Sequence, residues 1–267
     1  MSIRILAIIP EPTTVDACMD TAAAAADAIT GAHLEALHVT VDPRSLIAAT
    51  EEVDFQLLRE RAEGTAHDRA VATRKAYELW LDRNGRPPFE WKELSGDESD
   101  EIGEEAKHFD VLVLARPHNA DGVDALYAAL YWIDRPFFLA PNRRPEQVSL
   151  VDKVVIAWSD TPQCRRAIAG IVPWLRAAHA TVILLIAEHG GMQPQEIEGL
   201  DGIPYETVII DRDDEKLGDQ IVTEAKRLGA TLLVTGAHRR NELVEWLVGH
   251  TTDQIVRHDD LTLFLAH

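Results

Sequence analysis

Cysteine is scarce in this 267-residue chain, which contains only Cys18 and Cys164. The two do not form a CxxC pair, and neither has the spacing of a metal ligand. Such usage suits a reducing compartment. Each cysteine falls near the start of an expected helix, where the helix dipole can lower a thiol pKa. We nevertheless expect both to be small buried side chains, which is the commoner role of a free cysteine.

Basic charge and long apolar runs are also lacking. Lysine and arginine number 26 against 45 aspartates and glutamates, so the formal net charge is −19. A surface this acidic repels nucleic-acid backbones and anionic lipids, which makes both poor partners. No apolar run approaches the roughly 20 residues that span a bilayer. The first ten residues lack the features of a signal peptide, so we expect a first strand there and a cytoplasmic protein.

Familiar catalytic motifs do not occur. The chain has no Gly-x-Ser-x-Gly elbow, Walker loop, HExxH pair or EF-hand spacing. A metal or acid–base site built from His238, His250 and His258 with Asp160 is a minor alternative. No catalytic residue is therefore assigned, and we expect a protein that is not an enzyme.

What the chain does contain is an internal repeat. Short β-branched runs at 5–9 and 154–158 are each followed by a proline-bearing turn, an alanine-rich helix and a second apolar strand. A helix, a strand and a last apolar strand close each half. This alternation predicts α/β domains with doubly wound parallel sheets and right-handed crossovers. The expected domains are residues 1–145 and 150–267, with five strands each.

The halves differ in their middle parts. Residues 45–83 have a helical pattern in the first half, whereas 188–202 in the second half are rich in glycine and proline. The second segment fits a mobile lid over a site or a plain surface loop equally well. The polar link at 142–149 is too short to hold the domains far apart.

Two loops of the second half follow the carboxyl ends of expected strands, where open α/β sheets bind ligands. One contains Trp158, Ser159 and Asp160, and the other begins at Gly236 and leads to Gly249. Glycines between a buried strand and a helix let backbone N–H groups approach a phosphate. Trp158, like Trp174 and Trp246, has an apolar context that favours a core position over a stacking platform.

The run 155–161 (VIAWSDT) and the spacing from Gly236 to Gly249 resemble a tandem universal stress protein, over both halves and most strongly at 153–267. The resemblance implies Rossmann-like, adenine nucleotide alpha hydrolase-like domains that pair through their last strands. It also implies ATP or AMP as ligand, held by a G-x2-G-x9-G-[ST] pattern, with no metal beyond nucleotide-bound magnesium. Phe137, Leu139, Leu263 and Leu265 should then lie at the contact between the halves. Mutual cover of these apolar edge strands is also expected on physical grounds.

The chain departs from the family pattern in several places. Arg239 stands where the pattern has glycine, and it either obstructs a phosphate or pairs with one. His250 replaces the serine or threonine, although Thr251 follows, and Asp160 lies one residue later than the usual aspartate. The first half lacks the glycine spacing, so we expect no phosphate site there. Its fourth strand is followed by Arg116, His118 and Asp121, which suit a surface loop or a polar pocket.

Two functions compete at this stage. The first is a cytoplasmic stress-response regulator with a degenerate adenine-nucleotide site in the second half, acting on unknown protein partners, as a monomer or a homodimer. The second is a non-nucleotide protein-interaction module whose ATP site has decayed. The site residues expected for the first function are Trp158, Ser159, Asp160, Gly236, His238, Arg239, Gly249, His250 and Thr251.

Overall fold

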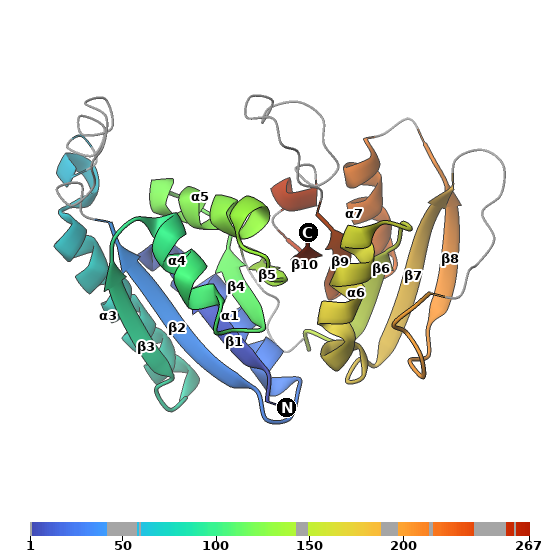
Figure 1. The fold of residues 1–267 in the computed structure, drawn as a ribbon, viewed down its shortest axis with the longest axis horizontal. Helices are drawn as coiled ribbons and strands as arrows, with labels where there is room; N and C mark the ends of the chain where they lie inside the picture. Colours follow the sequence, from blue (N-terminus) through green and yellow to red (C-terminus); the bar gives the residue numbers. More distant parts are fainter. Residues whose placement is uncertain are drawn as a thin grey trace.

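The computed structural model describes residues 2–41, 58, 60–142, 149–187, 197–213, 216–237, 255–258 and 260–267. Over these residues, ten strands form one sheet in the order β3-β2-β1-β4-β5-β10-β9-β6-β7-β8 (Figure 1). The strands are β1 (Arg4–Ile8), β2 (His33–Thr40), β3 (Glu90–Ser95), β4 (Val111–Ala115), β5 (Phe137–Ala140), β6 (Lys153–Ala157), β7 (Ala180–Ala187), β8 (Glu206–Asp211), β9 (Leu232–Gly236) and β10 (Thr262–Ala266).

Helices cover both faces of this sheet. Residues of α1, α3 and α6 pack into the apolar core on one face, and residues of α4, α5 and α7 pack into the core on the other. The helices are α1 (Val15–Asp27), α3 (Ala66–Asn84), α4 (Glu98–Ala106), α5 (Ala120–Tyr127), α6 (Pro162–Leu175) and α7 (Leu217–Arg227), with a 3-10 turn η1 (Pro12–Thr14) and a π-helix η2 (Ala128–Trp132).

The two halves have the same strand register. Ile5 of β1 pairs with Val111 of β4, and Val154 of β6 pairs with Leu232 of β9 in the corresponding place. All pairs within each half are parallel, and the central strands are buried on both faces, as their continuous apolar runs require. The predicted α/β class is therefore confirmed, and the strands fall into two groups of five.

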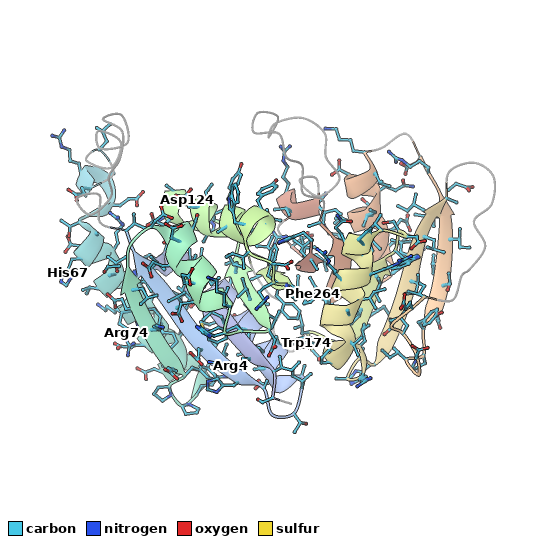
Figure 2. All side chains as sticks on the ribbon, viewed as in Figure 1. Arg4, His67, Arg74, Asp124, Trp174 and Phe264 are labelled. Atoms are coloured by element: carbon cyan, nitrogen blue, oxygen red, sulfur yellow. The ribbon has the colours of Figure 1, made fainter. Side chains whose placement is uncertain are left out.

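The halves meet at an antiparallel pair in the middle of the sheet. Phe264 of β10 lies opposite Phe138 of β5, so the two groups of strands form one continuous sheet. The ring of Trp174 on α6 lies 5.1 Å from that of Phe138, and the rings of Phe138 and Phe264 are 4.8 Å apart. Figure 2 shows Trp174 and Phe264 at the junction of the two halves. The indole Nε1 of Trp174 donates to the carbonyl of Ala25 in the first half at 2.8 Å. Trp174 is thus a core residue, as expected, and it packs against both halves.

The sequence located the helices well but not their ends. The helical pattern at 45–83 overlaps α3, which begins at Ala66 because the N-cap Thr65 and Asp68 in the first turn form a reciprocal capping box. Residues 58 and 60–63 of that pattern are also helical, whereas 45–57 and 59 lie outside the described residues. So do 188–196 of the expected loop and 143–148 of the link. In the part of the chain that the structure describes, no helix is long and apolar enough to cross a membrane.

Candidate functional site

The strand order reverses between β4 and β1 in the first half and between β9 and β6 in the second. In open α/β sheets, such reversals leave a crevice at the carboxyl ends of the strands where ligands bind. The two crevices of this chain are equivalent by the repeat but differ in what occupies them.

The crevice of the second half contains a hollow of about 140 Å³. The structure brings together Trp158, Ser159 and Gly236 there, three of the residues expected from the sequence. Trp158 is half-buried, is among the lining residues and also packs against the apolar core on the face covered by α1, α3 and α6, as its apolar context predicted. The full lining is Ala157, Trp158, Ser159, Cys164, Leu184, Ile186, Leu217, Ile221, Thr235 and Gly236.

Gly236 is required here by a close backbone approach. A Cβ atom on Gly236 would lie 2.6 Å from the backbone nitrogen of Cys164 and 2.8 Å from the carbonyl carbon of Gln163. Both atoms belong to the first turn of α6, which Thr161 caps by accepting a hydrogen bond from the Cys164 N–H. Glycine therefore lets the end of β9 lie directly against the start of α6.

Polar atoms at this end of the hollow belong mainly to the turn after β6. Ser159 Oγ lies 3.2 Å from Cys164 Sγ, within hydrogen-bonding distance, and Cys164 is buried as expected. Asp160 is not among the lining residues, because its carboxylate is exposed and pairs with Arg165 of α6 at 2.5 Å.

Part of the site expected from the sequence falls outside the part of the chain that the structure describes. His238, Arg239, Gly249, His250 and Thr251 lie outside the described residues, as does Trp246. Of the four groups in the histidine alternative, Asp160 pairs with Arg165, and His258 contacts Asp219 of α7 at 3.0 Å.

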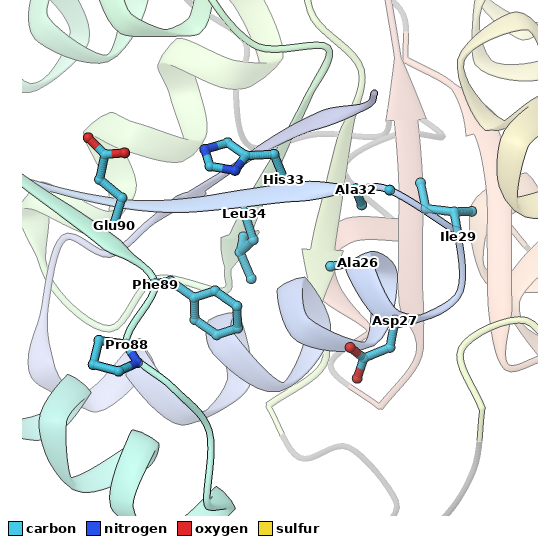
Figure 3. Close-up of a pocket in the computed structure, with 10 residues that line it drawn as sticks. Ala26, Asp27, Ile29, Ala32, His33, Leu34, Pro88, Phe89 and Glu90 are labelled. Carbon is cyan, nitrogen blue, oxygen red and sulfur yellow. The ribbon is translucent and has the colours of Figure 1, made fainter. Parts of the chain in front are cut away.

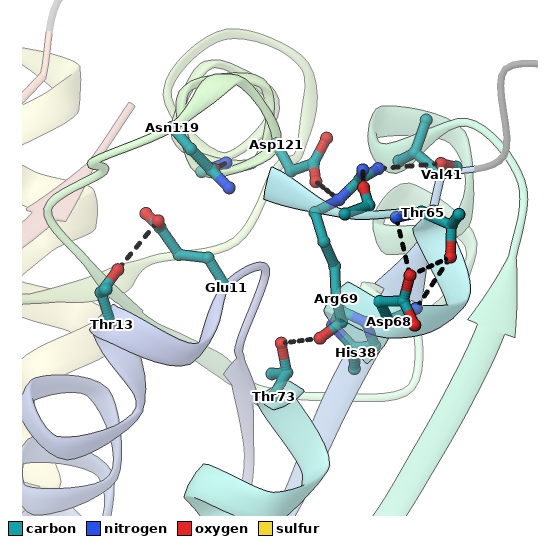
Figure 4. Close-up of polar contacts among 12 residues, drawn as sticks. Glu11, Thr13, His38, Val41, Thr65, Asp68, Arg69, Thr73, Asn119 and Asp121 are labelled. Atoms are coloured by element: carbon teal, nitrogen blue, oxygen red, sulfur yellow. Dashed lines mark hydrogen bonds and ion pairs between the residues drawn. The ribbon is translucent and has the colours of Figure 1, made fainter. Parts of the chain in front are cut away.

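The equivalent crevice of the first half is occupied by a glutamate of the chain itself (Figure 4). Ile5 and Val154 are at equivalent positions in the two halves, because they pair with Val111 and Leu232 in the same register. Glu11 and Asp160 follow them at the same distance along the chain, so Glu11 corresponds to Asp160. The Glu11 carboxylate is 4% exposed and accepts hydrogen bonds from the His118 N–H at 2.7 Å and the Thr13 hydroxyl at 2.9 Å. An internal anion thus satisfies a backbone amide of the loop after β4, where a bound phosphate would need one.

Arg69 and His38 lie beside this glutamate in the same crevice. Arg69 of α3 and Asp121 of α5 are both buried, with a guanidinium nitrogen 4.0 Å from a carboxylate oxygen. His38 Nδ1 lies 2.8 Å from the Ile9 carbonyl. Burial lowers the pKa of His38, so its ring is neutral near pH 7 and donates from Nδ1 to that carbonyl.

The surface-loop interpretation of the segment after β4 is wrong for Arg116 and Asp121, which are both buried. The Arg116 guanidinium donates to the carbonyls of Ala140, Val256, His258 and Leu261, at 3.1 Å to Val256 and 3.3 Å to Leu261. Three of these carbonyls belong to the second half. The sequence did not predict this role, because these partners of Arg116 lie about 140 residues away along the chain and produce no pattern near Arg116 itself.

A larger hollow of about 440 Å³ lies at the opposite, amino ends of β2 and β3 (Figure 3). Leu34, Pro88 and Phe89 line it, and its one carboxylate on α1, Asp27, already pairs with Arg86. It is a wide depression whose lining is largely apolar, with His33 and Glu90 as the polar residues at the starts of β2 and β3.

Comparison with known proteins agrees with the fold described above. The model of the universal stress protein family matches residues 186–263. A universal stress protein from Archaeoglobus fulgidus DSM 4304 is 13% identical with a TM-score of 0.60, over 98% of this chain and 95% of that one. A functionally unknown protein from Pseudomonas aeruginosa PAO1 is 14% identical with a TM-score of 0.54, over 98% and 92%. No protein with a curated description matches. The structural likeness is one of fold, and the family match is confined to residues 186–263 of the second half.

Proposed function

We propose that this chain is a cytoplasmic stress-response regulatory protein built from two universal-stress-protein-like domains, 1–145 and 150–267. Its second half binds an adenine nucleotide, ATP or AMP, and it has no catalytic activity. The observation that supports this proposal is the difference between the two crevices: the second is open beside Gly236, whereas Glu11 fills the first.

The shape of the second crevice suits one end of a nucleotide. Ser159 supplies a hydroxyl, Thr235 and Gly236 supply the end of β9, and Leu184, Ile186 and Ile221 supply apolar side chains. The hollow of about 140 Å³ is smaller than the roughly 300 Å³ at which ligand pockets begin. Residues 238–252 would therefore have to supply the phosphate contacts.

Calorimetric titration of the full chain with ATP and with AMP, in the presence of magnesium, tests this proposal. We expect saturable binding to one site, accompanied by a change in tryptophan fluorescence through Trp158. A Trp158→Phe variant should keep most of the binding but lose that fluorescence change. Absence of heat for both nucleotides would refute nucleotide binding, and appearance of ADP or AMP from ATP would refute the absence of catalysis.

A non-nucleotide interaction module is the second candidate, and one contact favours it. The Asp160 carboxylate is paired with Arg165 rather than turned into the hollow, so a nucleoside would have to do without it or break that pair. If the site has decayed, the natural chain binds no nucleotide and Arg239→Gly restores binding. If the site is active, the natural chain binds nucleotide without that substitution.

A further inference from the structure

Three metal-ligating side chains converge at the amino ends of β2 and β3, far along the strands from both crevices. They are His33 and Glu35 of β2 and Glu90 of β3, and one ligand atom of each lies within 4.8 Å of the others. Among the residues that the structure describes, these three form the only group of this kind.

The pleat of the sheet produces this arrangement. His33 and Glu35 are two residues apart on one strand, so they project from the same face. Glu90 pairs with Glu35 in the parallel register, which places its side chain on that face too. Figure 3 shows His33 and Glu90 on one side of β2, with Leu34 and Phe89 on the other.

We propose that His33, Glu35 and Glu90 bind a divalent transition-metal ion of the zinc class. One imidazole nitrogen and two carboxylate oxygens are ligands that zinc accepts, and three protein ligands leave a fourth position for water. His33 Nε2 already lies 2.9 Å from Glu35 Oε1. Two ligands of a tetrahedral zinc ion with bonds of about 2.1 Å are roughly 3.4 Å apart. The ion could therefore replace this hydrogen bond with little movement of the strand.

The charges of the cluster favour a cation. Glu35 and Glu90 face each other on neighbouring strands, where like charges are unfavourable. Arg4 of β1 contributes one positive charge, with its Nη2 atom 2.9 Å from Glu35 Oε1. Two carboxylates against one guanidinium leave one negative charge when His33 is neutral. Glu35 is nearly buried and fixed in place, whereas His33 and Glu90 are exposed, so an ion can enter from solvent.

The test titrates the metal-free full chain with zinc in a calorimeter and with cobalt by visible absorption, which reports coordination geometry. We expect one site that His33→Ala and Glu90→Gln each weaken about tenfold or more. His179→Ala is the matched histidine control, because His179 makes a similar pair with Asp152 at 3.0 Å but belongs to no group of three. Glu93→Gln is the matched control on β3, since Glu93 is exposed on the opposite face.

The Arg4→Met variant should change the zinc affinity in the opposite direction to His33→Ala and Glu90→Gln. Removing the guanidinium deletes a like charge next to the ion, so zinc should bind several-fold more tightly by Coulomb's law. Weaker binding in Arg4→Met would overturn the proposal, as would unchanged zinc affinity in both His33→Ala and Glu90→Gln. An equal loss in His179→Ala would also overturn it. Circular dichroism of each metal-free variant establishes that the exposed substitutions leave the fold intact.

Discussion

The close contact between β9 and α6 at the second crevice depends on the absence of a side chain at Gly236. In Gly236→Ala the new Cβ would meet backbone atoms of α6 at 2.6 and 2.8 Å, and backbone atoms cannot swing aside. We expect a loss of about 1–3 kcal/mol in the free energy of unfolding, as for overpacked cores. Denaturant titration measures this loss.

The control for that substitution is Gly103→Ala within α4. No atom lies within 4 Å of a Cβ placed there, so alanine should stabilise the helix by about 0.5–1 kcal/mol. The two glycines should therefore change stability in opposite directions. A neutral Gly236→Ala would show that β9 and α6 are not in the close contact described above.

Cys18 makes stability depend on pH in the alkaline range. Its side chain is fully buried on α1 between β1 and β4, and burial strongly raises the pKa of the thiol. In the unfolded chain the thiol ionises above about pH 8.5. Above that pH the unfolded state binds fewer protons than the folded state, so the free energy of unfolding falls as pH rises.

The contribution of Cys18 can be isolated by comparison with Cys18→Ala. Between pH 9 and 10 the natural chain should lose about 1.4 kcal/mol per pH unit more than the variant. Urea titrations at several pH values measure the two slopes. Equal slopes would mean that the thiol ionises as readily in the folded chain as in the unfolded one. The comparison uses slopes because the small cavity left by alanine shifts both values together.

At the scale of helices and strands, the sequence predicted the elements whose cause is local. The apolar runs of β1 and β6 and the alanine-rich α1 could be found from pattern alone, because burial on both faces and helix propensity act within a segment. The start of α6 is likewise local, because Thr161 caps it and Pro162 opens it.

The candidate site was less predictable, because its decisive contacts are between segments distant in sequence. Ser159 and Gly236 could be expected together from strand order, since both follow neighbouring parallel strands. Glu11 could not be recognised as the occupant of the first crevice, since its partner is the amide of His118 on another loop. The group of His33, Glu35 and Glu90 was missed for the same reason: Glu90 comes from a strand whose register the sequence does not specify.

The hydrogen bonds that join Arg116, after β4, to the segment before β10 predict that this residue stabilises the fold. Arg116 donates to four carbonyls. Two of them, those of Val256 and His258, lie at the carboxyl end of the helical residues 255–257. A guanidinium at a helix carboxyl end is favourable both as a donor and toward the helix dipole. Arg116→Met keeps much of the side-chain volume but leaves these carbonyls without their donor. We expect a cost of about 2–4 kcal/mol in the free energy of unfolding.

An arginine on the surface supplies the comparison for Arg116. Arg176→Met at the end of α6 changes an exposed residue and should stay within about 0.5 kcal/mol of the natural chain. Hydrogen exchange would locate the effect, with faster exchange of amides on both sides of the contact in Arg116→Met. Equal stabilities of the two variants would contradict the role given to Arg116.

At the scale of the whole molecule, one repeated architecture has two different crevices within a single sheet. The strand registers of the two halves correspond, so the backbone of the sheet does not distinguish the halves. Side chains do: Glu11 fills one crevice, whereas the hollow beside Gly236 stays open in the other. The joined β5 and β10 leave β3 and β8 as the outer edges of the sheet. The apolar core on each face of the sheet contains residues of both halves, so a ligand in the second half would bind to a molecule whose halves are packed together.

That shared core predicts cooperative unfolding. Trp174 is buried against Phe138 and Phe264, and its indole donates to Ala25 of the other half. Trp174→Ala should cost about 3–5 kcal/mol, as for other large buried aromatics. Because the lost contacts belong to both halves, we expect the whole chain to unfold in one transition at a lower temperature. Calorimetry and circular dichroism should give the same midpoint.

Trp132→Ala is the matched control for this prediction, because the side chain of Trp132 on η2 is 73% exposed. Its midpoint should stay close to that of the natural chain, with a change of stability within about 0.5 kcal/mol. The informative contrary result is a Trp174→Ala protein that unfolds in two separate steps. Each half would then be stable without the other, and the continuous sheet would join two domains without making them one cooperative unit.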